Sequence, residues 1–231
     1  MSKLSALRLA VRDTQKLAKF YTQYMGMRAT PEGDSVRLGY GHEDTTLVLC
    51  PGGGDYIHDR TDNYWKIGIT LPNVDIAYQQ LTSAGIPVSS PNQFGDIGYM
   101  CHLSDPEGFV IELLQHDFEH NRPKDAGHTD LPLGGGARIG QITLRCSDIE
   151  QELDAYQAHG MTLLSIQPVT QYGFTLYFLA FTDDIPPNSD LQAVENREWL
   201  WKRPYSTLEL QHCPGSKIRK SPNYLALEIN R

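Results

Sequence analysis

The sequence predicts an α+β protein built from a repeated unit of one strand, one helix and further strands. Three apolar strands each end at a polar residue that is suited to cap a helix: Asp13, Asn73 and Asp148. A stretch of about three helical turns follows each cap. Each stretch closes on a glycine: Gly26, Gly85 and Gly160. More strand-like sequence then follows, so we expect the same unit to occur three times along the chain.

The first repeat begins with an apolar strand at residues 4–11. Apolar and aromatic residues then recur at helical spacing between Asp13 and Gly26. Two short strands are expected at residues 35–40 and 45–50. The repeat therefore reads as one strand, one helix and two strands.

The second repeat has the same order of elements. A strand is predicted at residues 65–71, and after the helix further strands are expected near Val88 and at residues 98–103. The segment 105–108, Asp-Pro-Glu-Gly, has the composition of a tight turn. It leads into a last strand at residues 109–114.

A polar segment with several Pro and Gly residues, 116–137, is the best domain boundary in the chain. The third repeat follows, with a hairpin of strands 163–169 and 174–181 and a polar excursion at residues 182–203. Strands 205–211 and 224–230 complete the chain. We therefore predict a two-module domain at residues 1–115, the linker 116–137, and a single-module, truncated domain at residues 138–231.

A single repeat buries too little surface to be stable alone, so we expect the repeats to pair as small curved sheets, each with its helix on one face. The formal net charge of −8 argues against nucleic acid or a membrane surface as partner. Cysteines 50, 101, 146 and 213 lie far apart, without a Cys-x-x-Cys pair. Reduced thiols and a cytoplasmic location are the simplest expectation.

Several segments resemble a known family. Residues 105–113, DPEGFVIEL, are similar to the terminal strand of the vicinal-oxygen-chelate superfamily, which includes glyoxalase I, bleomycin-resistance proteins and extradiol dioxygenases. Residues 66–74, KIGITLPNV, resemble the strand that opens the second half of glyoxalase I. In the third repeat, QITLRCSD (141–148), LYFLAF (176–181) and TLELQH (207–212) resemble the first half of glyoxalase I, in that order.

The resemblance implies βαβββ modules that pair into open, curved sheets around one divalent metal ion, such as zinc, nickel or manganese. The ligands come from the first and last strands of each module and are carboxylate, imidazole or amide groups. The bound metal polarises the substrate, and a neighbouring carboxylate moves the proton.

In the first two repeats the four ligand positions hold Ala6, Val48, Lys66 and Glu112. Of these, Glu112 alone could bind a metal, and Lys66 stands where the family usually has histidine. We therefore expect a cleft without the metal of the family, in which the Lys66 ammonium sits near the metal position and pairs with Glu112. Glu112 is a candidate catalytic carboxylate, and Lys66 a candidate substrate-binding residue.

The third repeat carries Gln141 and Glu209 at positions that match metal ligands of glyoxalase I, and Glu209 is also a candidate catalytic carboxylate. Arg145 resembles an arginine that the family uses to hold a glutathione carboxylate. It lies four residues after Gln141 and so faces the same side of a strand. Lys220 lies about where a second anion-binding residue occurs.

Two ligands alone do not make a catalytic metal site, and three completions are open. Two chains could pair their third repeats about a two-fold axis, which is the reason to expect a homodimer. The second and third repeats of one chain could pair instead, and would then bring Lys66, Glu112, Gln141 and Glu209 together. In the third alternative, Gln141 and Glu209 are relics that hydrogen-bond to each other.

Two functions remain from the sequence. The first is binding of a small anionic or aromatic molecule in a degenerate, metal-free cleft. The alternative is a metal-dependent, glyoxalase-like lyase or isomerase that uses Gln141 and Glu209, completed by a dimer partner. For the second function, one divalent metal ion is the expected cofactor.

Overall fold

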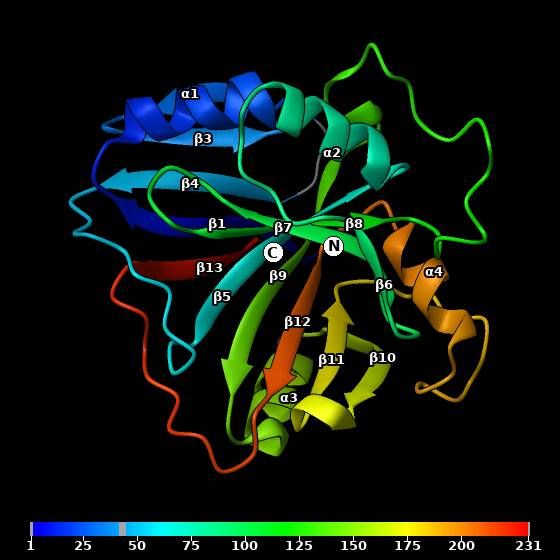
Figure 1. Ribbon diagram of the computed structural model, residues 1–231. Helices are drawn as coiled ribbons and strands as arrows, with labels where there is room; N and C mark the ends of the chain where they lie inside the picture. Colours follow the sequence, from blue (N-terminus) through cyan, green and yellow to red (C-terminus); the bar gives the residue numbers. More distant parts are fainter. Residues whose placement is uncertain (1, 42–44, 231) are drawn as a thin grey trace.

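The computed structural model describes residues 2–41 and 45–230, which form two curved sheets (Figure 1). The first sheet has the strand order β13-β1-β4-β3-β2. Its strands are β1 (Lys3–Val11), β2 (Arg28–Glu32), β3 (Ser35–Gly39), β4 (Thr46–Pro51) and β13 (Tyr224–Asn230). Helix α1 (Thr14–Tyr24) packs on β3 and β4, and so covers one face of this sheet.

The second sheet contains the strands of the second and third repeats, in the order β10-β11-β12-β9-β5-β8-β7-β6. The second repeat contributes β5 (Tyr64–Leu71), α2 (Val74–Ser83), β6 (Asn92–Phe94), β7 (Gly98–Ser104) and β8 (Val110–Gln115). The third contributes β9 (Arg138–Cys146), α3 (Ile149–Ala158), β10 (Thr162–Val169), β11 (Phe174–Ala180), α4 (Glu195–Trp201) and β12 (Thr207–His212). The α+β class with repeated βαβββ modules and open, curved sheets, predicted from the sequence, is confirmed.

The predicted helix starts and stops are present in all three repeats. The carboxylate of Asp13 accepts hydrogen bonds from the backbone N–H groups of Gln15 and Lys16, and Asn73 and Asp148 cap α2 and α3 in the same way. The three closing glycines have positive φ angles, which side-chain-bearing residues rarely adopt: Gly26 (70°), Gly85 (75°) and Gly160 (95°). The local signals in the sequence therefore act as expected.

The pairing of the repeats differs from the expectation that the first two repeats share a sheet. Strand β5 of the second repeat pairs antiparallel with β9 of the third, while the first repeat pairs through β1 with β13. The segment 116–137 carries the chain from β8 back to β9, beside β5. Of the three completions left open by the sequence, the structure has the pairing of second and third repeats within one chain. The hydrogen bond between Gln141 and Glu209, expected in the third alternative, is present as well. A homodimer is not needed to bring the four residues together and stays a prediction.

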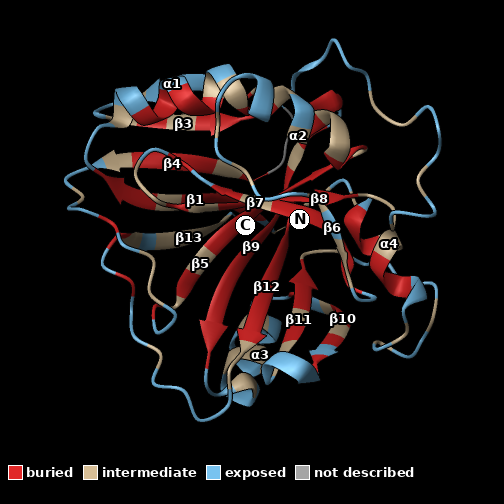
Figure 2. Ribbon diagram, in the orientation of Figure 1, coloured by how far each residue is buried: buried red, intermediate tan, exposed pale blue. Residues whose placement is uncertain are grey.

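The centre of the eight-stranded sheet is the most buried part of the fold. Strands β5, β9 and β12 are buried along nearly their whole lengths, whereas the connecting loops are exposed (Figure 2). One large apolar core contains residues of both sheets, and a smaller cluster lies on the other face of the eight-stranded sheet, beneath α4. Helix α4 lies in the polar excursion 182–203, for which the sequence predicts no helix. In the part of the chain that the structure describes, no helix is long and apolar enough to span a membrane.

Candidate functional site

Two rows of paired residues cross the centre of the eight-stranded sheet and place six polar side chains on one face. In the first row, His102 pairs with Glu112, Glu112 with Gly68, and Gly68 with Gln141. In the second row, two residues further along β9, Lys66 pairs with Thr143, and Thr143 with Glu209. Residues two apart on a strand share a face, so the two rows meet as one polar floor.

Gly68 makes room for this floor. A Cβ atom at position 68 would lie 2.2 Å from Cγ of Gln141, closer than any two non-bonded carbons approach. The Gln141 side chain therefore lies across the backbone of β5, over the one residue of the row that has no side chain. In this position its amide reaches Glu112 of β8 and Glu209 of β12.

Lys66 is the hub of a buried ion network. Its Nζ atom lies 2.9 Å from Oε1 of Glu112 and 3.3 Å from Oε2 of Glu209. Nε2 of Gln141 donates to the same two carboxylates, at 2.6 Å and 2.8 Å. The three charged side chains are at most 5% exposed, so each charge depends on these partners for the solvation that it has lost.

The two glutamates are held differently. Burial raises the pKa of both, but at Glu112 the nearby Lys66 and His102, whose Nε2 atom lies 2.9 Å from Oε2 of Glu112, outweigh burial and lower the pKa. Burial, and after it the neighbouring Glu112, raise the pKa of Glu209. The Lys66 ammonium and the hydrogen bond from the Thr143 hydroxyl at 2.9 Å only partly offset this rise. Of the two carboxyls, Glu209 is therefore the one that protonates more readily.

A cavity of about 350 Å³ lies over this floor, and its walls are mostly apolar. Six aromatic side chains line it: Trp65, Phe94, Tyr172, Phe174, Phe178 and Trp201. Tyr172 is 63% exposed and so lies at the opening, where its ring is 5.7 Å from that of Phe94 and 6.3 Å from that of Phe174. These distances and nearly parallel planes are those of stacked rings.

Helix α4 closes one side of the cavity by linking the third repeat to the second. Nε1 of Trp201 donates a hydrogen bond of 3.1 Å to the carbonyl of Ile97, and the buried Arg197 forms an ion pair of 2.5 Å with Asp96. Trp201 also packs edge-to-face against Phe178 in the cavity wall. Helix α4, which belongs to the third repeat, is therefore held against the second repeat and forms a cavity wall between the two.

The structure separates Arg145 and Lys220 from the cavity that Lys66 lines. Both lie at a second, more polar cavity of about 310 Å³, beside Arg219 and the start of α3. The Arg145 guanidinium donates to the amide oxygen of Gln211 at 2.9 Å and to two backbone carbonyls, and it stacks on Trp65 at 4.7 Å. The three predicted substrate-binding residues are therefore not gathered in one site.

The floor supplies oxygen ligands that a hard divalent ion could use, from Glu112, Gln141 and Glu209. The Lys66 ammonium, however, lies within 3.3 Å of both carboxylates and holds the position between them. A second cation there would meet a fixed positive charge. Among residues 2–41 and 45–230, no three His, Cys, Asp or Glu side chains form a group that could hold a metal ion. The residues present do not fit the metal ion that the family resemblance implies.

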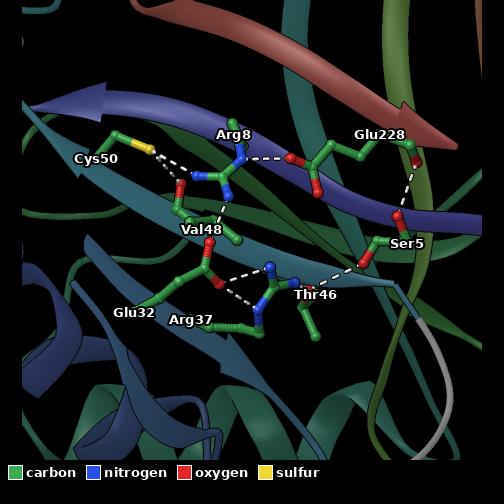
Figure 3. Close-up of polar contacts among 8 residues, drawn as sticks. All are labelled: Ser5, Arg8, Glu32, Arg37, Thr46, Val48, Cys50 and Glu228. Atoms are coloured by element: carbon green, nitrogen blue, oxygen red, sulfur yellow. Dashed lines mark hydrogen bonds and ion pairs between the residues drawn. The ribbon is translucent and has the colours of Figure 1, made fainter. Parts of the chain in front are cut away.

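The two remaining ligand positions, Ala6 and Val48, lie in the other sheet. Arg8, two residues after Ala6 on β1 and paired in register with Val48 of β4, forms ion pairs with Glu32 of β2 and, at 2.5 Å, with Glu228 of β13 (Figure 3). Arg37 forms a further ion pair of 2.6 Å with Glu32. This face of the five-stranded sheet is therefore occupied by an arginine–glutamate cluster in place of a metal site.

The sequence-based prediction missed two parts of the site. Thr143 lies midway between Gln141 and Arg145, so alternation along the strand could have found it. The aromatic rim of Phe94 and Tyr172 comes from a three-residue strand and a hairpin turn, which carry no periodic signal. His102 of β7 also lines the cavity.

Comparison with known proteins gives the same family resemblance as the sequence segments and the fold. Residues 3–113 match the Glyoxalase/Bleomycin resistance protein/Dioxygenase superfamily. The lactoylglutathione lyase of Schizosaccharomyces pombe is 24% identical, with 96% of this chain and 76% of that protein aligned. A probable chloroplastic lactoylglutathione lyase of Arabidopsis thaliana is 27% identical over 74% of this chain, which spans 48% of the relative.

Glyoxalase I from Zea mays has the same fold. Its crystal structure superposes with a TM-score of 0.71 at 20% sequence identity, over 99% of this chain and 74% of the maize chain. At that identity the likeness establishes the arrangement of strands and helices. The chain therefore resembles the glyoxalase/bleomycin resistance protein/dioxygenase superfamily: residues 3–113 match its family model, and the fold of glyoxalase I extends over both halves of the chain.

Proposed function

We propose that the protein binds a small, planar aromatic molecule in the cavity between the second and third repeats, without a metal ion. The observation that carries the proposal is the buried Lys66 ammonium between Glu112 and Glu209, at the base of a cavity with six aromatic side chains in its walls. An apolar pocket with a few fixed polar groups at one end is typical of small-molecule sites, and 350 Å³ is within their usual range.

Of the two ligand classes expected from the sequence, the aromatic one is better supported. Among the described residues that line the cavity, Lys66 is the sole Lys or Arg, and it is already paired with two carboxylates. An anion would therefore meet a floor with more negative than positive charge. The rings of Phe94, Tyr172 and Phe174 offer stacking surfaces that an aromatic ligand can extend.

Titration with indole, followed by saturation-transfer NMR and calorimetry in the presence of EDTA, tests this proposal. We expect saturable binding of one equivalent and a loss of about twofold to tenfold in affinity in Tyr172→Leu, because a stacked aromatic contact contributes about 0.5–1.5 kcal/mol beyond its area. Tyr78→Leu makes the same change on α2, away from the cavity lining, and should leave the affinity unchanged. No binding, or equal effects of the two variants, would contradict the proposal.

A glyoxalase-type lyase is the second candidate, because the relatives aligned over most of the chain are lactoylglutathione lyases and because Glu112, Gln141 and Glu209 meet at one locus. Metal analysis of the purified protein and an assay with the methylglyoxal–glutathione hemithioacetal separate the two candidates. Turnover with stoichiometric metal, both lost in the Gln141→Ala, Glu209→Ala double variant, would favour the lyase. We expect neither metal nor turnover.

A further inference from the structure

Two acceptor oxygens in the cavity floor have no hydrogen-bond partner within the described chain. They are Oε1 of Gln141 and Oε1 of Glu209. Both residues line the cavity, and they are only 2% and 1% exposed. Buried acceptors are almost always paired in folded proteins, so two unpaired ones at the base of a cavity indicate a partner that arrives from outside the chain.

The orientation of the Gln141 amide follows from its neighbours. Its nitrogen lies within 2.8 Å of Oε1 of Glu112 and Oε2 of Glu209. Turning the amide over would place its carbonyl oxygen against two carboxylates, which have no hydrogen to donate. The carbonyl oxygen must therefore be the end that faces away from the glutamates and remains unpaired.

The donors of the floor are already engaged. The Lys66 ammonium contacts Glu112 and Glu209, and a third side of it faces the ring of Trp65 at 4.6 Å from the ring centre. The Thr143 hydroxyl donates to Oε2 of Glu209. The floor can thus accept hydrogen bonds from a ligand, but it has little left to donate.

We infer that the cavity selects aromatic molecules that carry N–H or O–H donors, such as aryl amines and amidines, and rejects aromatic carboxylates. The inference rests on the proposed function and names its ligand class. A planar amidinium presents two N–H groups side by side, and it can satisfy the unpaired oxygens of Gln141 and Glu209 while its positive charge offsets the excess negative charge of the floor. A carboxylate of the same shape would leave both acceptors unpaired and add a like charge.

Benzamidine and benzoate form a matched pair of probes, because they share the ring and the planar three-atom head and differ in charge and hydrogen-bonding sense. Calorimetric titration of the unmodified chain should show benzamidine binding at least about tenfold more tightly than benzoate. Glu209→Gln should reduce this preference to about threefold or less, because it removes one acceptor and one negative charge. Tyr172→Leu should weaken both probes by the same factor.

The possible results distinguish a failure of the inferred ligand class from a failure of the proposed aromatic site. Equal affinities, or tighter binding of benzoate, would overturn the inference while leaving an aromatic site in place. If neither probe nor indole bound, the proposed function would fail and the inference with it. The urea midpoint of Glu209→Gln is measured in parallel. If that variant does not fold, the preference of the unmodified chain decides the result alone.

Discussion

The ammonium group of Lys66 and the carboxylate of Glu112 lie 2.9 Å apart in the interior of the eight-stranded sheet. Their strands, β5 and β8, are parallel neighbours in one repeat, so the pair is set by a single module. Glu209, 3.3 Å from the same nitrogen, comes from the other module. Lys66 thus forms ion pairs with carboxylates from both halves of the sheet, at the base of the cavity.

Lys66→Met should destabilise the protein by about 3–5 kcal/mol, because it leaves two buried carboxylates without a positive partner. Burial and mutual repulsion would then raise the pKa of both glutamates. Urea denaturation at neutral pH measures the change in the free energy of unfolding. Lys124→Met, at an exposed lysine, is the matched control and should change stability little. A loss of under about 1 kcal/mol would show that the network contributes little.

Gly68→Ala should displace Gln141 from the floor, because the new Cβ atom would lie 2.2 Å from Cγ of Gln141. Both hydrogen bonds from the amide to Glu112 and Glu209 would be lost, at a cost of about 2–4 kcal/mol in the free energy of unfolding. Gly54→Ala is the control, since no atom lies within 4 Å of the added methyl group there. Unchanged stability in Gly68→Ala would contradict the described position of Gln141.

Asp105 gives the protein a stability that falls as the pH rises. Burial raises the pKa of its carboxyl from 3.8 to about 6, although the Tyr21 hydroxyl donates to it at 2.9 Å. The folded state therefore holds a proton that the unfolded state has lost between about pH 4 and pH 6. The contribution of Asp105 to the free energy of unfolding is complete below about pH 4 and declines by about 3 kcal/mol as the pH rises to about 6.

Asp105→Asn should remove this slope. Urea denaturation of both proteins at about pH 4, 5 and 6 measures it, and the stability of the variant relative to the unmodified protein should increase with pH over this range. Asp125→Asn, at an exposed carboxylate, should leave the slope as it is. A difference between the Asp105 variant and the unmodified chain that does not vary with pH would contradict the raised pKa.

The local structure could be predicted from the sequence because it depends on short-range signals. Asp13, Asn73 and Asp148 cap their helices by contacts with residues two or three positions away. The sequence left the pairing of the repeats open among alternatives, because the first strand of every repeat is largely apolar and none of them specifies its neighbour. Helix α4 gave no signal either, since Val194 precedes it without a capping side chain and the helix is only seven residues long.

The residues of the candidate site that could be predicted are those at positions that match the ligand positions of the family. Gln141, Glu209, Lys66 and Glu112 were identified at matching strand positions, and the pairing of Lys66 with Glu112 was expected from charge. The cavity walls could not be predicted, since they depend on contacts between distant segments. Trp201, for example, hydrogen-bonds to Ile97 of the other repeat. Arg145 shares a strand face with Gln141, as expected, but Trp65 and the backbone carbonyls of residues 59 and 62 hold it away from the cavity.

The central claim, that the Lys66 ammonium takes the place of a metal ion, is tested most directly by calorimetric titration of zinc into the unmodified protein and into Lys66→His. Histidine removes the fixed charge and adds an imidazole to the oxygen ligands of Glu112, Gln141 and Glu209. We predict no stoichiometric binding to the unmodified protein and one equivalent bound to Lys66→His, lost again when Glu209→Ala is added. One equivalent of zinc bound by the unmodified protein, and lost in Glu209→Ala, would contradict the account.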